Sequence, residues 1–443
     1  MELEGLKVLV VGLGKSGMAA TELLVEKGAH PHGTDSRQLE SLPGVGPFLD
    51  RLGVPFSQQS HAPFSGVDLV VVSPGVPLDL AELDQSRARA IPVIGELELS
   101  SAFLRGSVIG ITGSNGKTTT TALEGHLLKS CGIPCQVGGN IGLPPAAMVA
   151  ASRDGQWNVL ELSSFQLETI KSFRARIAVC LNVTPDHLDR HYSFDAYEAA
   201  KRRLFETQSA GDWAVLNADN PVTASWKDMS LAAPVWFSLE RRLESGWWLE
   251  DGTIRADGDA FMPASEIPLP GRHNVENVMA AAAAARLAGA PLAGIRAAVK
   301  TFPGVEHRIE FVREAGGVRY YNDSKATNVD AALKAIDAFD GGLWIILGGK
   351  DKGGDYSPLG PALRRKARGA MLIGAAAGKI GSQISGDVPL FECGNLETAV
   401  TKAAGMARHG DIVLLAPACA SFDQFQNYEE RGRMFKTFVA NIV

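Results

Sequence analysis

Short apolar runs alternate with longer segments of helical periodicity along most of the chain. Buried parallel strands have continuous apolar runs in the sequence, whereas the helices between them carry an apolar residue every three or four positions. Near the N-terminus the two kinds of segment alternate. The apolar runs lie at 7–11, 68–73 and 91–94, and the helix-like segments at 17–27 and 80–90. This part of the chain is therefore predicted to form a β-α-β domain with a parallel sheet.

The alternation restarts twice farther along. The second series opens at 107–112 and ends with an alanine-rich helix at 274–290, and the third follows Phe302-Pro303-Gly304. Residues 212–268 carry short aromatic and polar strands, for which we expect an edge sheet. The length of 443 residues suits about three domains. We predict an α/β fold with a Rossmann-like domain at 1–97, a central P-loop ATPase-like domain with a mostly parallel sheet at 98–301, and a Rossmann-like α/β domain at 302–443.

The composition narrows the class of protein. Hydrophobic residues make up 45% of the chain and charged residues 21%, which is typical of a globular protein. A net charge of −6 gives no general attraction for nucleic acid or an anionic membrane surface. The chain has no apolar run long enough to span a bilayer, and acidic residues stand at its N-terminus where a signal peptide would be basic. We expect a cytoplasmic protein without nucleic-acid or membrane partners. Five scattered cysteines favour reduced thiols.

A glycine turn follows the first apolar run. Gly12, Gly14 and Gly17 have the spacing of a dinucleotide-binding turn, and Asp35 follows at about the expected distance. This motif alone suggests a nicotinamide oxidoreductase. It equally suits another pyrophosphate, because backbone N–H groups at a helix N-terminus do not distinguish what the phosphates carry.

A second glycine loop, "GITGSNGKTTT", lies at 110–120. Its Gly113-Ser114-Asn115-Gly116-Lys117-Thr118 follows an apolar strand and precedes a helix, as a phosphate-binding loop does, although the spacing is shorter than in the strict P-loop pattern. In such a loop the lysine contacts the γ-phosphate and the hydroxyl contacts Mg²⁺. The loop therefore predicts ATP as a cofactor.

Carboxylate and imidazole groups follow the next two strands of this series. Glu161 closes "WNVLELSSF", and we expect its side chain to be exposed at the end of the strand, holding a cation or pairing with a base. The text "NVTPDHLDRH" supplies Asp186, His187, Asp189 and His191. His187 and His191 have zinc-like spacing, but no third ligand is evident. Beside a nucleotide loop, Mg²⁺ is favoured.

Taken together, six blocks resemble the Mur ligases, ATP-dependent enzymes that add amino acids one at a time to the muramic acid of peptidoglycan precursors. The blocks are "GITGSNGKTTT", "LELSSFQLE", "NVTPDHLDRH", "GRHNVEN", "EHRIE" and "NDSKATN". Within the family, "GLGKSG" with "TDSR" at 34–37 and "PACASFDQFQNYEERG" at 417–432 are similar to the members that add D-glutamate. The resemblance covers nearly the whole chain.

The resemblance implies substrates and cofactors. The substrates would be UDP-N-acetylmuramoyl-L-alanine and D-glutamate, joined through an acyl phosphate with ATP and two Mg²⁺ ions, in a protein that we expect to be a monomer. The first domain would bind the UDP-sugar, the central domain ATP and the last domain the amino acid. The implied UDP-substrate contacts are Gly14, Lys15, Ser16, Asp35, Ser36, Arg37, Ser73, Pro74, Gly75, Asn140 and Ser163.

The resemblance also implies the residues of the reaction. The ATP contacts would be Gly113, Ser114, Asn115, Gly116, Lys117, Thr118, Thr119, Asn274, Asn277, His307, Arg308, Asp323 and Lys325. The metal ligands would be Thr118, Glu161, His187 and Lys201, and the catalytic residues Lys117, Glu161, His187 and Lys201. Thr327, Lys352, Ser421 and Tyr428 would bind the amino acid.

Several of these residues have a second interpretation. Lys201 lies in "YEAAKRRLFE" and by pattern alone would be a solvated lysine, whereas the resemblance implies that CO₂ carbamylates it, which requires a lowered pKa. Asn274 could be a helix cap. Lys350 could replace Lys352, and Phe422, Phe425 and Tyr428 could form a core stripe.

Other function classes remain open from the sequence. They are a nicotinamide oxidoreductase fused to an ATPase module, a folylpolyglutamate-type ligase, and a non-catalytic nucleotide-binding regulator. The oxidoreductase leaves Glu161, His187 and Lys201 unexplained, and the folylpolyglutamate-type ligase lacks the N-terminal "GLGKSG" unit.

Overall fold

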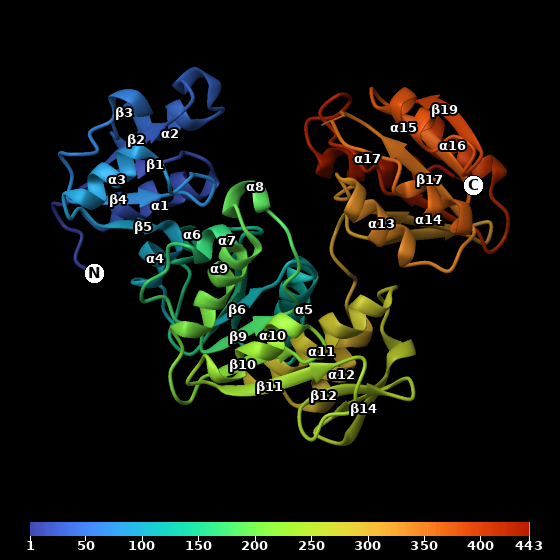
Figure 1. Cartoon of the computed structure of the whole chain (residues 1–443), viewed down its shortest axis with the longest axis horizontal. Helices are drawn as coiled ribbons and strands as arrows, with labels where there is room; N and C mark the ends of the chain where they lie inside the picture. Colours follow the sequence, from blue (N-terminus) through green and yellow to red (C-terminus); the bar gives the residue numbers. More distant parts are fainter. Residues whose placement is uncertain (352, 443) are drawn as a thin grey trace. The chain divides into compact units, whose positions relative to one another are not determined.

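The computed structural model describes residues 1–351 and 353–442, with the side chains of Asp189 and Asp228 left aside. In these residues the strands form three sheets of five, nine and six strands, each with helices packed against it (Figure 1). The predicted α/β class with three sheet-containing domains is confirmed. None of the described helices has the length and apolar character that crossing a membrane requires.

The first sheet is parallel throughout, with strand order β3-β2-β1-β4-β5. The order reverses between β1 and β4, and in open α/β sheets ligands bind at the carboxyl ends of the strands at such a point. The strands are β1 (Lys7–Val11), β2 (His30–Asp35), β3 (Phe56–Gln58), β4 (Leu69–Val72) and β5 (Val93–Gly95), and the helices are α1 (Lys15–Glu26), α2 (Val45–Leu52), α3 (Ala81–Ala88) and α4 (Glu96–Ser101).

The second sheet has the order β14-β13-β12-β11-β10-β9-β6-β8-β7, and only β12 to β14 pair antiparallel. The edge sheet expected at 212–268 is the far end of this same sheet. The strands are β6 (Ser107–Thr112), β7 (Cys135–Gly139), β8 (Trp157–Glu161), β9 (Ile177–Cys180), β10 (Trp213–Asn217), β11 (Ala233–Ser238), β12 (Trp247–Glu250), β13 (Thr253–Ala256) and β14 (Asp259–Pro263).

The helices of this part of the chain begin with the one that follows the phosphate loop. They are α5 (Lys117–Ser130), α6 (Pro145–Met148), α7 (Ser164–Leu167), α8 (Leu188–His191), α9 (Phe194–Glu206), α10 (Pro221–Ser225), α11 (Arg272–Leu287) and α12 (Leu292–Thr301). Strand β6 lies between β9 and β8, so the loops after these three strands meet at one edge.

The third sheet has the order β15-β16-β20-β17-β18-β19 and is parallel except for the β15–β16 pair. Its strands are β15 (Glu310–Ala315), β16 (Val318–Asn322), β17 (Leu343–Gly348), β18 (Ala367–Ile373), β19 (Leu390–Gly394) and β20 (Ile412–Leu415), and its helices are α13 (Val329–Asp337), α14 (Leu359–Lys366), α15 (Ala377–Gln383), α16 (Leu396–Met406) and α17 (Tyr428–Ala440).

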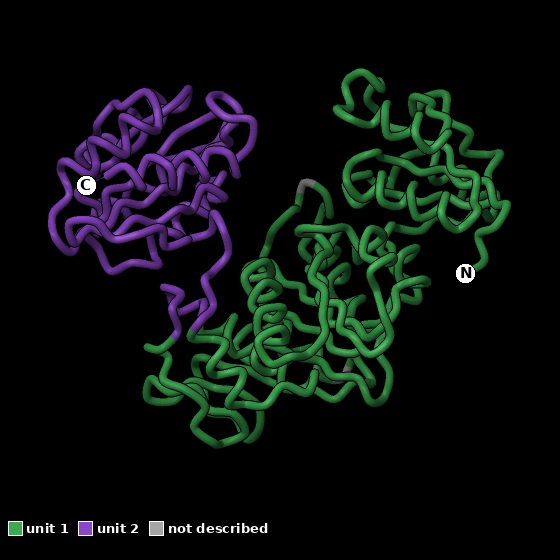
Figure 2. Tube along the Cα trace, turned by 180° about the vertical axis from the view of Figure 1, so that it is seen from behind, with its two compact units in different colours: residues 1–266, 275–300 green, residues 267–274, 301–443 purple. Residues whose placement is uncertain are grey.

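The chain divides into two compact units (Figure 2). One comprises residues 1–266 and 275–300, with the first two sheets, and the other residues 267–274 and 301–443, with the third. The boundary predicted after residue 97 falls inside α4. The three predicted domain ranges stay a prediction.

Candidate active site

The phosphate loop spans the gap between β6 and α5. Gly113 and Gly116 have φ angles of +149° and +87°, which favour glycine. A Cβ on Gly116 would lie 2.4 Å from the Asn277 side-chain oxygen, so a side chain at that position would also collide. The loop therefore brings the first N–H groups of α5 to an open backbone turn, where a phosphate can bind.

The loop is held by neighbouring segments. Ser114 Oγ donates to the Thr184 carbonyl oxygen at 2.9 Å, and the Asn115 N–H donates to Asn182 at 2.9 Å. The Lys117 ammonium folds back across the loop and donates to the carbonyl oxygens of Gly113 and Ser114, at 2.9 and 3.0 Å. The predicted phosphate lysine thus lies within the loop that it would serve.

Glu161 lies beside this loop, because it pairs with Ile111 across β8 and β6. The expectation of an exposed side chain is wrong: Glu161 is only 2% exposed, since the sheet and the segment around Asn140 cover it. Its Oε1 accepts from Asn140 Nδ2 at 2.9 Å, and its Oε2 has no hydrogen-bond partner among the residues that the structure describes. A buried carboxylate oxygen in this state is costly and fits a bound cation.

Lys201 is almost fully buried, at 1% exposure, so the alternative of a solvated lysine is wrong. Its Nζ donates to the Gly113 carbonyl oxygen at 2.9 Å and lies 4.6 Å from the centre of the Tyr197 ring. Burial, and secondarily the Lys117 charge, lowers the pKa of Lys201 to about 7. An appreciable share of the chains therefore carries a neutral amine at neutral pH.

The two histidines after β9 separate. His187 has a half-exposed side chain, and its ring lies 4.9 Å from that of Phe165. His191 is buried and bonds Ser164 at 2.9 Å, with Glu168 3.1 Å away. Within the described part of the chain, no three His, Cys, Asp or Glu side chains gather as a metal cluster. The zinc-like spacing is thus not used, and the Asp189 side chain lies outside the described residues.

Tyr197 is a site residue that sequence reasoning missed. It is buried, its hydroxyl lies 3.0 Å from Ser114 Oγ, and its ring lies 5.3 Å from His191 and 6.4 Å from His187. Burial raises the pKa of this phenol well above its usual value, so the hydroxyl is neutral. The only available signal was its place one helical turn before Lys201 in the same helix.

The first sheet holds the other glycine turn at its switch point. A Cβ on Gly17 would lie 1.8 Å from the Gly12 oxygen, so α1 can pack there only with glycine. Ser73 Oγ donates to that oxygen at 2.6 Å. Asp35 is buried, and its carboxylate accepts hydrogen bonds from the Leu13 N–H at 3.0 Å and from the Arg37 side chain. Burial alone would raise the pKa of Asp35, but these hydrogen bonds outweigh it and lower the pKa. Asp35 therefore braces the turn as well as ending β2.

The remaining residues predicted to contact the UDP-sugar lie near the same edges. Gly14 is the N-cap of α1, and Lys15 and Ser16 are in its first turn. Ser36 and Gly75 are exposed, and Pro74 is partly buried. Ser163 caps α7 through a reciprocal pair of hydrogen bonds with Gln166. Asn140 is exposed, and its side-chain nitrogen donates to Glu161.

The asparagines of α11 differ in surroundings. The helix begins at Arg272, so Asn274 lies in its first turn and is not the cap; its side chain donates to the Pro270 carbonyl oxygen at 2.6 Å. The Asn277 side-chain oxygen accepts from Thr120 at 3.2 Å, one turn below the phosphate loop. Thr118 and Thr119 are buried in the first turn of α5.

The carboxyl edge of the third sheet gathers another group. His307 is buried and bonds Asn322 at 2.9 Å, and the Lys325 N–H donates to the His307 carbonyl oxygen at 3.1 Å. Burial raises the pKa of Asp323, one residue after β16, to about 7, although the charge of Arg308 opposes the shift. The ring of Tyr428, the first residue of α17, lies 6.2 Å from that of His307.

The predicted amino-acid residues lie around this edge. Thr327 is partly buried five residues after β16, and Ser421 is buried in the loop after β20. Phe422 is 64% exposed, so the three aromatic residues do not form a core stripe. Lys352 lies outside the described residues. Arg431, missed in the sequence, is buried and bonds the carbonyl oxygens of Ser324 and Cys419, which ties the two loops together.

Three known domain families match the chain in order. They are the Mur ligase MurD-like N-terminal domain at 6–95, the Mur ligase middle domain at 111–285, and the Mur ligase, glutamate ligase domain at 307–419. A protein of Solibacter usitatus named UDP-N-acetylmuramoylalanine--D-glutamate ligase is 57% identical over 439 residues, covering 99% of this chain and 98% of that protein. The chain belongs to the Mur ligase family.

Other relatives of this Mur ligase agree. A protein of the same name from Acidobacterium capsulatum is 53% identical and covers 99% of this chain and 97% of its own. Two solved structures share the fold. UDP-N-acetylmuramate-alanine ligase from Thermotoga maritima has a TM-score of 0.60 and 20% identity, and the match covers 98% of this chain and 99% of that one. MurF ligase from the same organism, in complex with ADP, has a TM-score of 0.60 and 18% identity, and the match covers 100% of this chain and 97% of that one. The predicted family is confirmed, and the oxidoreductase and folylpolyglutamate-type alternatives are not favoured.

Proposed function

We propose that this Mur ligase joins D-glutamate to UDP-N-acetylmuramoyl-L-alanine and converts ATP to ADP and phosphate. Relatives that carry the corresponding name match 99% of the chain at 57% and 53% identity. The main structural support is the arrangement at one edge of the central sheet. There the phosphate loop with Lys117 adjoins Glu161, a buried carboxylate with one unpartnered oxygen among the described residues, and Lys201, a buried lysine with a pKa of about 7.

The reaction has two steps that each bring anions together. A carboxylate oxygen of the L-alanyl group first bonds to the γ-phosphorus of ATP, and the bond from that phosphorus to the bridging oxygen breaks, releasing ADP. The D-glutamate nitrogen then bonds to the acyl carbon, loses a proton, and phosphate departs. Catalysis of such steps depends on positioning and on neutralising charge. Lys117 and the α5 N-terminus supply positive charge to the phosphoryl group.

Magnesium suits this site. The Thr118 hydroxyl and the open oxygen of Glu161 are hard oxygen ligands of the kind that Mg²⁺ prefers, and His187 with a carbamylated Lys201 would serve a second ion. Bound magnesium would neutralise the phosphate oxygens during transfer. Carbamylation joins the Lys201 nitrogen to the carbon of CO₂ with loss of one proton, which turns an amine into an anion.

Glu161→Gln is expected to lower kcat about 100-fold and to raise the Mg²⁺ concentration for half-maximal activity about 10-fold. The amide keeps the size of the side chain and an acceptor for Asn140, but it loses the charge. A Mg²⁺ titration of phosphate release measures both effects. Glu124→Gln is a matched control, because Glu124 is fully buried in α5 with both oxygens unpartnered among the described residues. An unchanged Mg²⁺ dependence in Glu161→Gln would show that Glu161 is not a magnesium ligand.

Tyr197→Phe is expected to raise the KM for ATP about five-fold with little change in kcat. The variant loses the bond to Ser114 at the phosphate loop, worth about 1 kcal/mol, while Ser114 keeps its bond to Thr184. Steady-state kinetics with varied ATP test this. The control is Tyr320→Phe, a buried tyrosine of β16. Equal effects of the two variants on the KM for ATP would contradict the role of Tyr197.

The first and third sheets, together with two asparagines of α11, provide the remaining contacts in this proposal. The glycine turn with Lys15, Ser16, Ser36, Arg37 and Ser73 binds the UDP-sugar. His307, Arg308, Asp323 and Lys325, with Asn274 and Asn277, contribute to ATP binding, and Thr327, Ser421 and Tyr428 recognise the two carboxylates of D-glutamate.

One assay tests the function directly. Phosphate release from ATP is measured with UDP-N-acetylmuramoyl-L-alanine and, in turn, D-glutamate, L-glutamate, meso-diaminopimelate and L-lysine. Release that depends on D-glutamate and yields the amide supports the proposal. Phosphate release that depends on another of these amino acids would show that the enzyme adds that amino acid and not D-glutamate. Sedimentation of the same preparation tests the expected monomer.

A further inference from the structure

Helix α8 is short and has an unusual backbone at both ends. His187 directly precedes it with φ +52°, and Tyr192 directly follows it with φ +64°. Each such conformation costs about 1–3 kcal/mol in a residue other than glycine and persists only where neighbours hold it. The position of His187 therefore depends on what anchors α8.

Glu168 and Ser164 anchor one side of the helix. Arg190 Nη2 donates to Glu168 Oε2 at 3.0 Å, and His191 Nδ1 lies 3.1 Å from Glu168 Oε1. His191 also bonds Ser164 at 2.9 Å. The Arg190 side chain is only 16% exposed, which strengthens its ion pair relative to a surface one.

The other side of the helix is joined to the first sheet. Arg190 Nη2 also donates to the Val76 carbonyl oxygen at 2.9 Å, and the Tyr192 hydroxyl donates to Asp79 at 2.7 Å. Val76 belongs to the loop that begins at Ser73, whose hydroxyl bonds the Gly12 oxygen. Val76 also packs on Gly12, where its Cγ2 would lie 2.8 Å from an added Cβ. Arg190 thus contacts the loop that lines the first glycine turn.

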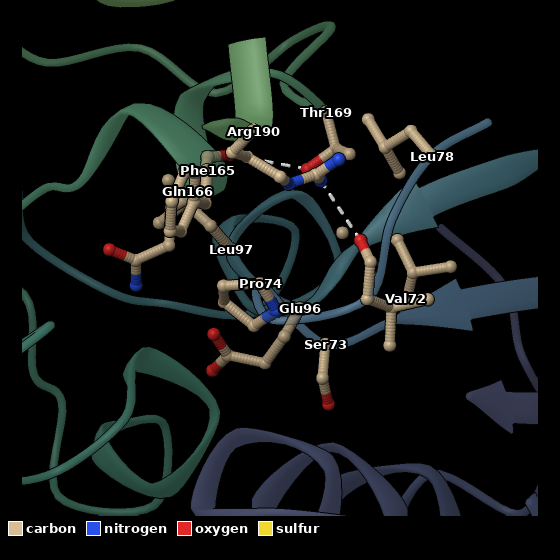
Figure 3. A pocket seen from close by; sticks show the side chains of 12 residues that line it. Val72, Ser73, Pro74, Leu78, Glu96, Leu97, Phe165, Gln166, Thr169 and Arg190 are labelled. Carbon is tan, nitrogen blue, oxygen red and sulfur yellow. Dashed lines mark hydrogen bonds between the residues drawn. The ribbon is translucent and has the colours of Figure 1, made fainter. Parts of the chain in front are cut away.

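The ring of Phe165 connects Arg190 with His187. The Arg190 guanidinium lies 5.5 Å from the ring centre, and the His187 and His191 rings lie 4.9 and 5.5 Å away. Figure 3 shows Arg190 and Phe165 on the same wall of a cavity that Ser73 and Pro74 line from the opposite side. Phe165 is therefore a neighbour that Arg190 and His187 share.

The Arg190 guanidinium has one nitrogen without an acceptor among the described residues. A small cavity, with room for about one water molecule, separates parts of the Ser73 loop from Phe165 and Thr169. Arg190 Nε is buried and has no acceptor within residues 1–351 and 353–442, so the guanidinium can take up a further bond when the loop moves. Arg190 thus joins the Ser73–Val76 loop on one side to a helix with a positive φ angle at both ends on the other.

We propose that Arg190 is a positioning residue that couples occupancy of the glycine turn on the first sheet to the placement of His187 beside the phosphate loop. A ligand at the turn fixes the Ser73–Val76 loop, the loop fixes Arg190, and Arg190 with Phe165 fixes α8. This inference rests on the proposed function for the identity of the two ligands. Binding at either site then strengthens binding at the other by the same factor.

Isothermal titration tests the coupling. The affinity for UDP-N-acetylmuramoyl-L-alanine is measured with and without a non-hydrolysable ATP analogue and Mg²⁺. We expect about ten-fold tighter binding in the presence of the analogue for the natural chain, within the range usual for coupled sites. In Arg190→Ala the ratio is expected to fall below two-fold, while the affinity for the analogue alone stays within two-fold.

Two further variants separate coupling from folding. Arg190→Lys keeps the charge but loses the planar guanidinium that lies against Phe165, so its ratio is also expected to fall. Its melting temperature shows whether the variant is folded. The control Arg202→Lys changes an arginine of α9 that pairs with Glu206, and its ratio should equal that of the natural chain. A ratio of one in the natural chain, or an unchanged ratio in Arg190→Lys, overturns the inference. Failure of D-glutamate-dependent turnover would instead overturn the proposed function.

Discussion

Replacing Lys117 with alanine is expected to lower kcat for phosphate release about 1,000-fold. The ammonium lies at the backbone turn of the phosphate loop, where it donates to the carbonyl oxygens of Gly113 and Ser114. Removing one preorganised charge from a transferring phosphoryl group costs two to three orders of magnitude or more. The loss should appear in kcat more than in the KM for ATP, because the backbone N–H groups of α5 remain.

The measurement is steady-state phosphate release together with titration of an ATP analogue. Lys129→Ala is the matched control, since it changes an exposed lysine in the last turn of the same helix. Its kcat should stay within two-fold of the natural chain. A Lys117→Ala variant that retains a tenth of the natural kcat would show that this lysine does not neutralise the phosphoryl group.

Lys201→Met is expected to abolish turnover, by about 1,000-fold or more, while raising thermal stability. The natural side chain is buried beside Gly113, and its carbonyl oxygen also accepts from Lys117. Two ammonium groups on one oxygen repel each other, and burial of the Lys201 charge costs free energy that methionine does not incur. A stability gain with loss of activity is the signature of a residue kept for its chemistry.

The sign of the pH dependence follows from the lowered pKa of Lys201. Its value is about 7 in the folded chain and 10.5 in the unfolded chain, so the unfolded state binds more protons between these values. Stability therefore rises with pH in this window, and the penalty is fully present below pH 7. The melting temperature of Lys201→Met should exceed that of the natural chain by a few degrees at pH 7, and the gap should narrow by pH 9.5.

Carbon dioxide gives an independent readout. At pH 7 about half of the chains would hold the neutral amine that reacts with CO₂, against about one in three thousand for an ordinary lysine. Activity of the natural chain should fall in CO₂-free buffer and return when bicarbonate is added. Arg202→Lys serves as the control for the helix. Full activity of Lys201→Met, or of the natural chain without CO₂, would exclude the carbamate.

The local elements were predictable because they depend on residues close together in the chain. The apolar runs located β1, β6, β8 and β9, and the glycines marked both turns before α1 and α5. The edge sheet at 212–268 was predicted as strands, but its continuity with the central sheet was not, because pairing between β9 and β10 is a contact distant in sequence. The family and the fold class followed from the order of such local blocks.

The sequence by itself determined where several strands lie, where glycine turns follow them, and that carboxylate, imidazole and amine side chains follow the central strands. Only the tertiary structure decided that Glu161 is buried with one open oxygen, that Lys201 shares the Gly113 oxygen with Lys117, and that Tyr197 and Arg190 link the loops. The reason is that burial, and with it pKa and the need for a partner, is set by segments that meet across the sheet. No pattern of neighbouring residues contains that information.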